Sequence, residues 1–231
     1  MQKDSVRSAT YVNGGLSGGG ANVYYQDGNK SFTAGLHRSH NFGKFQGYYG
    51  FRGVVGTYRV DSVHNNNGSW FHNDYLDEDI INANANRKFY GAAGAFGSLN
   101  FVIPSKSGEW RVIGAELSWD KEFGEYLDFR RSLRDTSANI IERRKDFLAL
   151  AISSDFVFVK RAGSVGFKIS LVNSLRNISG FDEHSMPMNL HSGYLSSTVH
   201  YQHEKLTGSL QWNMGSYAVM FMAGAAYRLS K

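Results

Sequence analysis

Histidine and carboxylate side chains, the residues most able to carry acid–base chemistry, gather in two polar segments of this chain. The members are His64, His72, Asp74, Asp77, Glu78 and Asp79 in the first segment and His184 and His191 in the second. A catalytic histidine needs a carboxylate that orients it and a nucleophile or water within hydrogen-bond reach. The residue order does not show such a set, so we expect solvated loop residues and keep an enzyme with His72 or His191 as base as an alternative.

Two further patterns resemble chemical motifs but lack their requirements. The string from Gly15 to Gly19 has the letters of a nucleophile elbow, yet no helical pattern follows it, and that motif needs a turn between a strand and a helix. The acidic run 74–79 lacks the alternating ligands and central glycine of a calcium loop. Cysteine is absent, which excludes disulfides, thiolate zinc sites and cysteine enzymes. We therefore predict no catalytic set, no metal site and no cofactor.

The composition indicates which elements must position these side chains. The chain has 26 Gly, 16 Phe, 13 Tyr and 4 Trp against 2 Pro, which is typical of strands rather than helices. Hydrophobic residues make up 42% of it but never form the run of about 20 that a membrane helix requires. Its length of 231 residues fits one domain, and its charge of +5 is mostly scattered, so nucleic acid is not an expected partner.

Strict alternation of apolar and polar residues recurs along the chain and is clearest near its end. One face of segment 217–229 carries Tyr217, Val219, Phe221, Ala223, Ala225, Tyr227 and Leu229, and the other carries Ala218, Met220, Met222, Gly224, Ala226 and Arg228. In segments 111–123 and 165–176 a set of charged residues shares a face with Gly and Ser, namely Glu116, Asp120, Glu122, Lys168 and Arg176. A large apolar face opposite a small polar one fits a barrel with lipid outside and a crowded lumen inside. A soluble lipocalin-like barrel is the structural alternative, and it would direct the apolar face inward.

The alternating segments predict ten strands, with eight or twelve as alternatives. Their expected ranges are 10–26, 31–40, 44–60, 88–103, 109–131, 141–160, 163–177, 192–204, 206–213 and 216–229. The run Gly18-Gly19-Gly20 suggests a β-bulge that resets the alternation of the first strand. We therefore predict an all-β fold, a transmembrane antiparallel up-and-down β-barrel.

The connections alternate between short and long, which predicts an orientation. Short turns follow the second, fourth, sixth and eighth strands, whereas long segments occupy 61–87, 132–140 and 178–191. Barrels of the bacterial outer membrane have short periplasmic turns and long extracellular loops. We therefore expect periplasmic termini, with 1–8 as a periplasmic segment. Because no apolar signal region follows Met1, we expect a mature form with a start Met in place of its signal.

Ionisable residues of both signs fall on the face predicted to line the lumen. They are Arg52, Glu116, Asp120, Asp155, Lys168 and Arg176, together with His37 and His200. Buried charges persist only when they are paired and hydrogen-bonded, so a structural ion-pair network is the expected interpretation. A gated pore or a proton-linked site built from the same groups is the functional alternative.

The pattern resembles one group of proteins over nearly the whole chain. Segments 45–58 and 89–101 combine Gly, Tyr, Phe and Ala in the manner of small Gram-negative outer-membrane β-barrel proteins. Gln2-Lys3 resembles mature starts common in Bacteroidetes barrels, whereas the usual aromatic C-terminal residue is replaced by Lys231, with Tyr227 nearby. The resemblance identifies no subfamily. It implies a location in the bacterial outer membrane.

A basic cluster lies on the two arms around residues 135–139. Its members are Arg130, Arg131, Arg134, Arg143, Arg144 and Lys145. If both arms project above the membrane, these side chains meet the phosphates of lipopolysaccharide, which the planar fork of arginine binds well. A solvated hairpin and the docking of a protein partner are alternatives for this cluster.

Our main hypothesis is a non-enzymatic barrel that serves as a subunit or anchor of an outer-membrane assembly. Its partners would be outer-membrane lipid, including lipopolysaccharide, and other outer-membrane proteins or lipoproteins, bound through the loops or the barrel wall. One alternative is an outer-membrane enzyme, either lipid A modifying or an omptin-like protease, that uses loop His and Asp residues. Another is a pore for small solutes.

Overall fold

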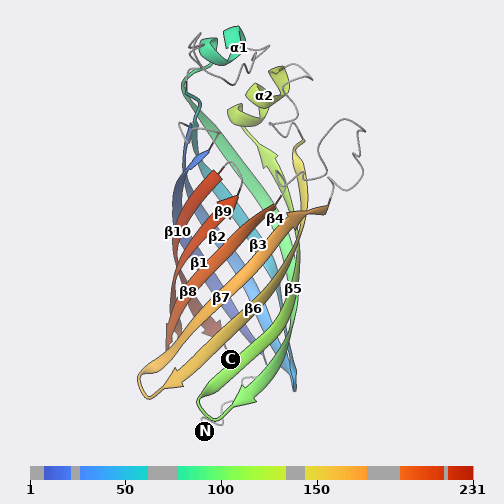
Figure 1. Ribbon diagram of the computed structural model, residues 1–231, viewed down its shortest axis with the longest axis vertical. Helices are drawn as coiled ribbons and strands as arrows, with labels where there is room; N and C mark the ends of the chain where they lie inside the picture. Colours follow the sequence, from blue (N-terminus) through green and yellow to red (C-terminus); the bar gives the residue numbers. More distant parts are fainter. Residues whose placement is uncertain are drawn as a thin grey trace, which may run out of the picture.

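The protein forms a closed barrel of ten antiparallel strands, each hydrogen-bonded to its sequence neighbours, with the first strand closing on the last (Figure 1). The computed structural model describes residues 8–21, 27–61, 78–133, 144–175, 193–215 and 218–230. The strands are β1 (Ser8–Ala21), β2 (Asp27–Phe42), β3 (Phe45–Arg59), β4 (Arg87–Ser105), β5 (Gly108–Phe123), β6 (Asp146–Lys160), β7 (Gly163–Ser174), β8 (Gly193–His203), β9 (Leu206–Gly215) and β10 (Ala218–Ser230). The predicted fold class and strand number are confirmed.

A helix replaces the last part of the predicted fifth strand. β5 ends at Phe123, and α2 (Glu125–Ser132) follows where the sequence had indicated a strand to residue 131. Gly124 has a φ of 110°, a conformation that glycine adopts readily and that turns the chain out of the sheet. Acidic residues in the first turn of α2 and basic residues in its last turn complement the helix dipole.

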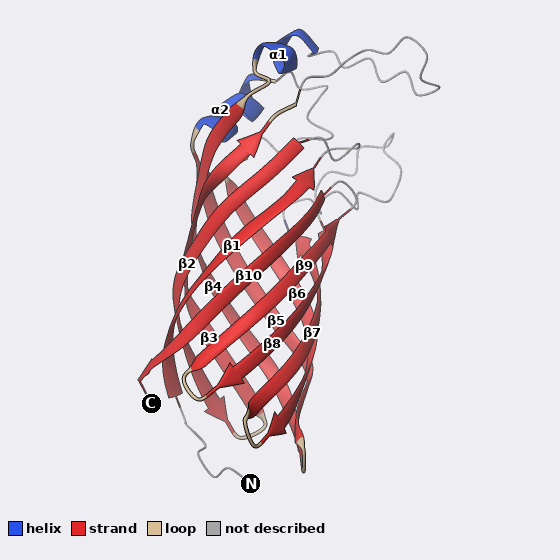
Figure 2. Ribbon diagram, turned by 90° about the vertical axis from the view of Figure 1, so that its left-hand side faces the viewer, coloured by secondary structure: helices blue, strands red, loops and turns tan. Residues whose placement is uncertain are grey.

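A second short helix, α1 (Glu78–Ala83), lies in the segment predicted to be the first long loop. None of the helices in the described part of the chain is long and apolar enough to cross a bilayer. Both helices lie at the end of the barrel opposite the short turns (Figure 2). β1 begins and β10 ends at the end of the barrel that carries the short turns, where Thr10 pairs with Ser230.

The predicted bulge at Gly18–Gly20 is wrong. β1 pairs without interruption from Gly18 to Ala21 with both neighbouring strands, and its one register shift lies between Thr10 and Tyr11. A Cβ on Gly19 would lie 2.0 Å from the carbonyl oxygen of Val219 in β10. The glycine therefore permits a close approach of two backbones. Across this β1–β10 seam Gly and Ala face each other in consecutive pairs, including Gly14 with Ala225 and Gly15 with Gly224.

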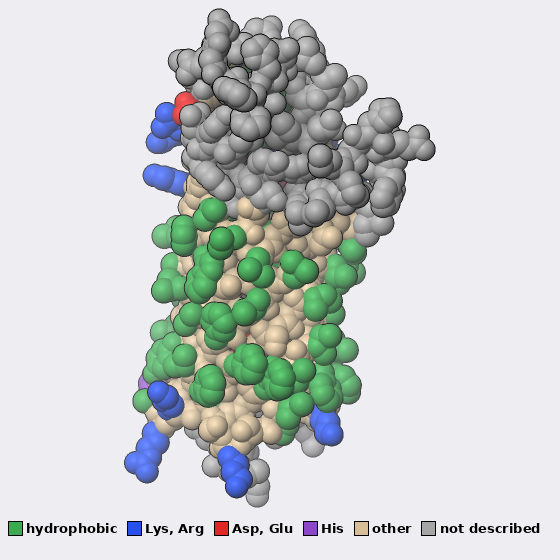
Figure 3. Space-filling view, viewed as in Figure 1, with side chains coloured by type: hydrophobic (Ala, Val, Ile, Leu, Met, Phe, Trp, Pro, Cys, Tyr) green, Lys and Arg blue, Asp and Glu red, His purple; other side chains and the backbone are tan. Residues whose placement is uncertain are grey.

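The outer wall of the barrel is apolar. Side chains of Leu16, Phe51, Leu171, Leu210 and Phe221 are each more than 60% exposed, and they belong to five different strands. Figure 3 shows such side chains in a broad band over the strands, with Lys and Arg near its two ends. The inward positions between them are mostly small or polar. The alternation has the predicted sense, and the lipocalin-like alternative, which needs apolar residues inside, is wrong.

A small apolar core lies outside the barrel, at its helical end. Val60, Phe129 and Leu133 are buried there, and partly buried side chains of β3, α1 and α2 pack around them, namely Tyr58, Ile80, Ile81 and Tyr126. The Tyr58 and Tyr126 rings stack with centroids 4.0 Å apart. This core fixes α1 and α2 to the top of β3, and we call the assembly of these two helices the outer platform.

Replacing Leu210 by arginine tests whether the wall faces lipid. Leu210 lies in the middle of β9 and is 63% exposed, whereas Leu206 is on the same face beside the turn. In phospholipid vesicles Leu210→Arg should lower the free energy of unfolding by about 2–4 kcal/mol, and Leu206→Arg by about 0–1 kcal/mol, because the cost of a charge depends on depth in the bilayer. Denaturant titration followed by tryptophan fluorescence measures both. Equal effects of the two variants would contradict a lipid-facing wall.

Candidate functional site: the barrel lumen

The lower part of the lumen, toward the short turns, is filled by ionic groups. Arg111 donates to Asp155 Oδ2 at 2.7 Å and to Glu109 Oε1 at 2.6 Å. His200 Nε2 lies 3.2 Å from the other oxygen of Asp155. The Asp155 carboxylate is thus engaged on both oxygens, as a buried charge requires.

Aromatic and hydrogen-bonded groups complete this layer from the opposite strands. The Tyr48 hydroxyl donates to Glu116 Oε2 at 2.6 Å. His37 stacks on Tyr11 with ring centroids 4.8 Å apart and packs near Phe96. We call these side chains, together with Arg111, Asp155 and His200, the lumen floor. Above it Arg52 forms a two-point ion pair with Asp120, with Nε donating to Oδ1 at 2.9 Å.

Most of the luminal residues predicted from the sequence face inward, but only some of them pair with each other. Arg52 joins Asp120, Asp155 joins His200, and Glu116 takes Tyr48 as its partner. Lys168 lies beside Asp155 in the register of β6 and β7 but forms no hydrogen bond or ion pair with the described residues. Arg176 lies outside the described residues.

Sequence reasoning missed Arg111, the central cation of the floor. Strict alternation backwards from Ile113 places residue 111 on the lipid face. A register shift between Arg111 and Gly114 reverses the alternation, so that Trp110 faces outward and Arg111 opposes Asp155. The available signal was Trp110 itself, a large apolar residue one position away from where the alternation expects it.

The charges in the described lumen balance. Among the described residues, the cations that line the lumen from the floor to the rim at Arg130 are Arg52, Arg111, Arg130, Lys168 and Arg228, and the anions are Glu109, Glu116, Asp120, Glu122 and Asp155. The two sets are equal in number, so a lumen with neutral histidines has no formal net charge. Such a balance lowers the cost of keeping these groups inside a low-dielectric membrane.

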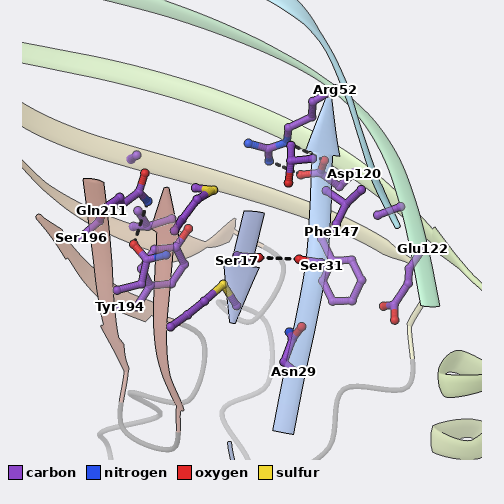
Figure 4. Close-up of a pocket in the computed structure, with 18 of the residues that line it drawn as sticks. Ser17, Asn29, Ser31, Arg52, Asp120, Glu122, Phe147, Tyr194, Ser196 and Gln211 are labelled. Atoms are coloured by element: carbon purple, nitrogen blue, oxygen red, sulfur yellow. Dashed lines mark hydrogen bonds and ion pairs between the residues drawn. The ribbon is translucent and has the colours of Figure 1, made fainter. Parts of the chain in front are cut away.

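A cavity of about 580 Å³ occupies the upper part of the lumen, between the floor and the outer platform. Figure 4 shows Arg52 and Asp120 on one side and Tyr194, Ser196 and Gln211 on the other. Serine, threonine, asparagine and glutamine side chains from β1, β2, β7, β8 and β9 contribute most of its uncharged polar lining.

Arg130 closes the upper rim of this cavity and does not join an exposed basic cluster. It is buried, forms an ion pair with Glu122, and lies over the Tyr126 ring at 4.8 Å from the ring centroid. Arg130 differs from the prediction of an exposed basic cluster because α2 folds it back onto the barrel. There it is unavailable to a lipid phosphate. Burial raises the pKa of the Tyr126 hydroxyl to about 12, so the ring that carries Arg130 is neutral at physiological pH.

The other predicted site residues fall at the edge of the described structure or beyond it. Arg131, Arg144 and Lys145 are exposed at the outer end, whereas Arg134 and Arg143 lie outside the described residues. Glu78 and Asp79 begin α1. The candidate loop residues His64, His72, Asp74, Asp77, His184 and His191 all lie outside the described ranges.

The described lumen does not assemble a catalytic set. His200 and Asp155 make a histidine–carboxylate pair, but within the described residues no hydroxyl group is hydrogen-bonded to His200 as a nucleophile would be. Nor does that part of the chain contain a group of three or more His, Cys, Asp or Glu side chains placed to hold a metal ion. In the floor, Arg111, Asp155 and Glu116 each have an ionic or hydrogen-bonded partner within the described lumen.

No protein-family model matches the chain, and no curated protein is similar in sequence. Among solved structures, similar ones include the translocator domain of the autotransporter NalP from Neisseria meningitidis, with 8% identity, a TM-score of 0.47, and coverage of 99% of this chain and 90% of that one. The transport unit of the autotransporter AIDA-I from Escherichia coli has 8% identity, a TM-score of 0.42 and coverage of 98% and 92%. LpxR from Salmonella typhimurium has 7% identity, a TM-score of 0.39 and coverage of 95% and 99%. These neighbours are bacterial outer-membrane β-barrels of differing roles, so the role of this chain must be argued from its own side chains.

Removing one partner from the floor should destabilise the barrel more than removing both. Arg111 is also paired with Glu109, so the test is made in a Glu109→Gln background, in which Asp155 is the carboxylate partner of Arg111 among the described residues. There Asp155→Asn is expected to cost about 3 kcal/mol, whereas Arg111→Met combined with Asp155→Leu should recover most of that loss. Denaturant unfolding in vesicles of the Asp155 and Arg111 single variants and of their double variant, all in this background, gives the coupling energy. Additive losses in the double variant would show that the pair is not coupled.

Proposed function

We propose that the chain is an integral β-barrel of the bacterial outer membrane. The observation that carries this proposal is the exposed apolar side of the strands around a closed barrel. Leu16, Phe51 and Leu210 would each leave a large apolar surface in water, whereas a bilayer solvates them. A closed barrel also satisfies the backbone hydrogen bonds of every strand, which hydrocarbon requires.

The proposed orientation places the short turns in the periplasm and the outer platform outside the cell. The turns between β2 and β3, β4 and β5, β6 and β7, and β8 and β9 are all short and lie at one end. The platform lies at the other end, where the described strands that precede and follow the segments predicted to be long also end. This asymmetry is the one that bacterial outer-membrane barrels have.

The proposed barrel is not a general pore. The floor contains Arg111, Asp155 and His200 from one side and Tyr48, His37 and Phe96 from the other, so side chains from opposite strands occupy the lumen at this level. Opening it would separate a paired carboxylate and guanidinium, which is costly. The pore alternative from the sequence therefore has less support than the anchor.

The function that this geometry supports best is a membrane-embedded anchor that presents the outer platform to a partner. The supporting feature is the apolar core of Val60, Phe129 and Leu133, against which side chains of α1 and α2 pack at the end of the barrel. Rigid elements make more precise binding sites than loops do. The exposed side chains of α2, including Asp128 and Arg131, are the proposed contact surface for another outer-membrane protein or lipoprotein.

A planar-bilayer recording tests the closed floor. The wild-type barrel should show no stable conductance, whereas Tyr48→Ala combined with His37→Ala should produce discrete openings, because both changes remove bulk from the floor. Tyr49→Ala, at the lipid-facing neighbour of Tyr48, is the matched control and should remain silent. Steady ion flow through the wild-type protein would favour the small-solute pore instead.

Charge reversal on the outer platform tests the partner. After crosslinking in native membranes, extraction in mild detergent should yield the wild-type protein in a complex that Asp128→Arg reduces severalfold, because the exposed side of α2 changes charge. Lys106→Glu, an exposed reversal in a turn at the opposite end, should leave the complex intact. Recovery of the wild-type chain only as a lone protomer would contradict the anchor, and equal losses in both variants would contradict the platform.

A further inference from the structure

The cavity above the lumen floor has two chemically different sides. On one side lie Arg52 and Asp120, which satisfy each other, and at the rim Arg130 and Glu122 do the same. The charged groups on this side are therefore already paired before any ligand binds. Glu116, at the bottom, accepts a hydrogen bond from Tyr48.

The opposite side carries hydroxyl groups that are not hydrogen-bonded to other side chains in the described part of the chain. Ser170 on β7 and Tyr194, Ser196 and Thr198 on β8 line the cavity, and none of them makes a side-chain hydrogen bond to the described residues. We call these four side chains the hydroxyl wall. Ser170 pairs with Ser196 in the register, and Lys168 at the lower end pairs with Thr198.

The spacing of the hydroxyl wall follows from the geometry of the sheet. Neighbours across two strands have Cβ atoms about 5 Å apart, and successive inward residues of one strand are about 7 Å apart. A hydroxyl group both donates and accepts a hydrogen bond, so this array can bind a molecule whose own groups donate and accept at several positions. Polyols and sugars have such groups on every side.

Charge and size narrow the ligand class. The ionisable side chains that line the cavity are Arg52, Arg130, Lys168, Glu116, Asp120 and Glu122, equal numbers of cations and anions. A volume of about 580 Å³ is within the range of small-molecule sites, which is about 300–1,000 Å³. Phe147 and Tyr194 add ring faces to this polar cavity, and such faces pack against the C–H side of a sugar ring.

We propose that the upper lumen is a binding site for an uncharged saccharide of one or two rings, held by the hydroxyl wall, by the amides of Gln211 and Asn213, and by the ring faces of Phe147 and Tyr194. The Gln211 amide donates to Asn213 at 2.8 Å, which orients both groups at the cavity edge. Lys168 supplies further donors to a sugar hydroxyl at the bottom of the site. This assignment is independent of the partner proposed for the outer platform.

Direct binding measurements on the full chain test the proposal. The chain is kept in micelles of dodecyldimethylamine oxide, because the sugar headgroups of maltoside detergents would compete for the site. Maltose serves as the neutral probe, lactobionate as an anionic disaccharide and glucosamine as a cationic sugar, each followed by saturation-transfer NMR and calorimetry. Maltose should bind more tightly than either charged probe. Preferred binding of lactobionate would overturn the neutral assignment in favour of an anion site at Lys168, and the absence of binding by every probe would overturn the site.

Two adjacent serines on β8 provide a matched pair of variants. Ser196 lines the cavity, whereas Ser197 is equally buried but does not line it. Ser196→Ala should weaken maltose binding about threefold to tenfold, the value of one hydrogen bond, and Ser197→Ala should leave it unchanged. Ala151→Phe, which fills the cavity from β6, should abolish binding, and thermal unfolding shows whether that variant is folded. Equal affinities of all three folded variants and wild type would place the sugar elsewhere.

Discussion

A backbone amide without a partner costs several kcal/mol in hydrocarbon, and this constraint underlies every level of the structure. It requires that the sheet have no free edge, so β1 must pair with β10. Closure then forces each strand to direct alternate side chains outward and inward. Apolar residues such as Phe51 and Leu210 consequently meet the surroundings, while Arg52 and Asp155 are enclosed and need counter-ions within the lumen.

Much of the fold follows from the sequence because alternation is local and repeated. The outward face of 219–229 and the inward position of Asp120 need only the parity of residue numbers along a strand. Parity fails wherever one extra residue enters a strand, and the shift between Arg111 and Gly114 therefore concealed the central cation of the floor. The bulge predicted at Gly18–Gly20 is wrong because a run of glycines has two structural meanings. It fits a β-bulge, and it fits equally well two strands whose backbones approach closely.

Long-range contacts determine what the sequence could not show. The α2 segment has enough aromatic and charged residues to continue a strand pattern. As a helix it packs Phe129 against Val60, which is distant in the chain, and the local sequence does not show this contact. Pairing partners in the lumen are likewise separated by many residues, as with Tyr48 and Glu116. Composition predicts that luminal charges are neutralised, but only the shear of the barrel decides which cation meets which carboxylate.

The glycine- and alanine-lined seam between β1 and β10 has a consequence for biogenesis. Its two strands are the most distant in the chain, so this pairing carries the highest contact order in the molecule and needs all other strands to be present first. Pairs such as Gly15 with Gly224 have no side chains to attract each other, which leaves main-chain hydrogen bonding as the force that joins them. Until β1 pairs with β10, the nascent sheet has two edge strands with unpaired backbone groups. Membrane insertion therefore competes with aggregation at this closing step.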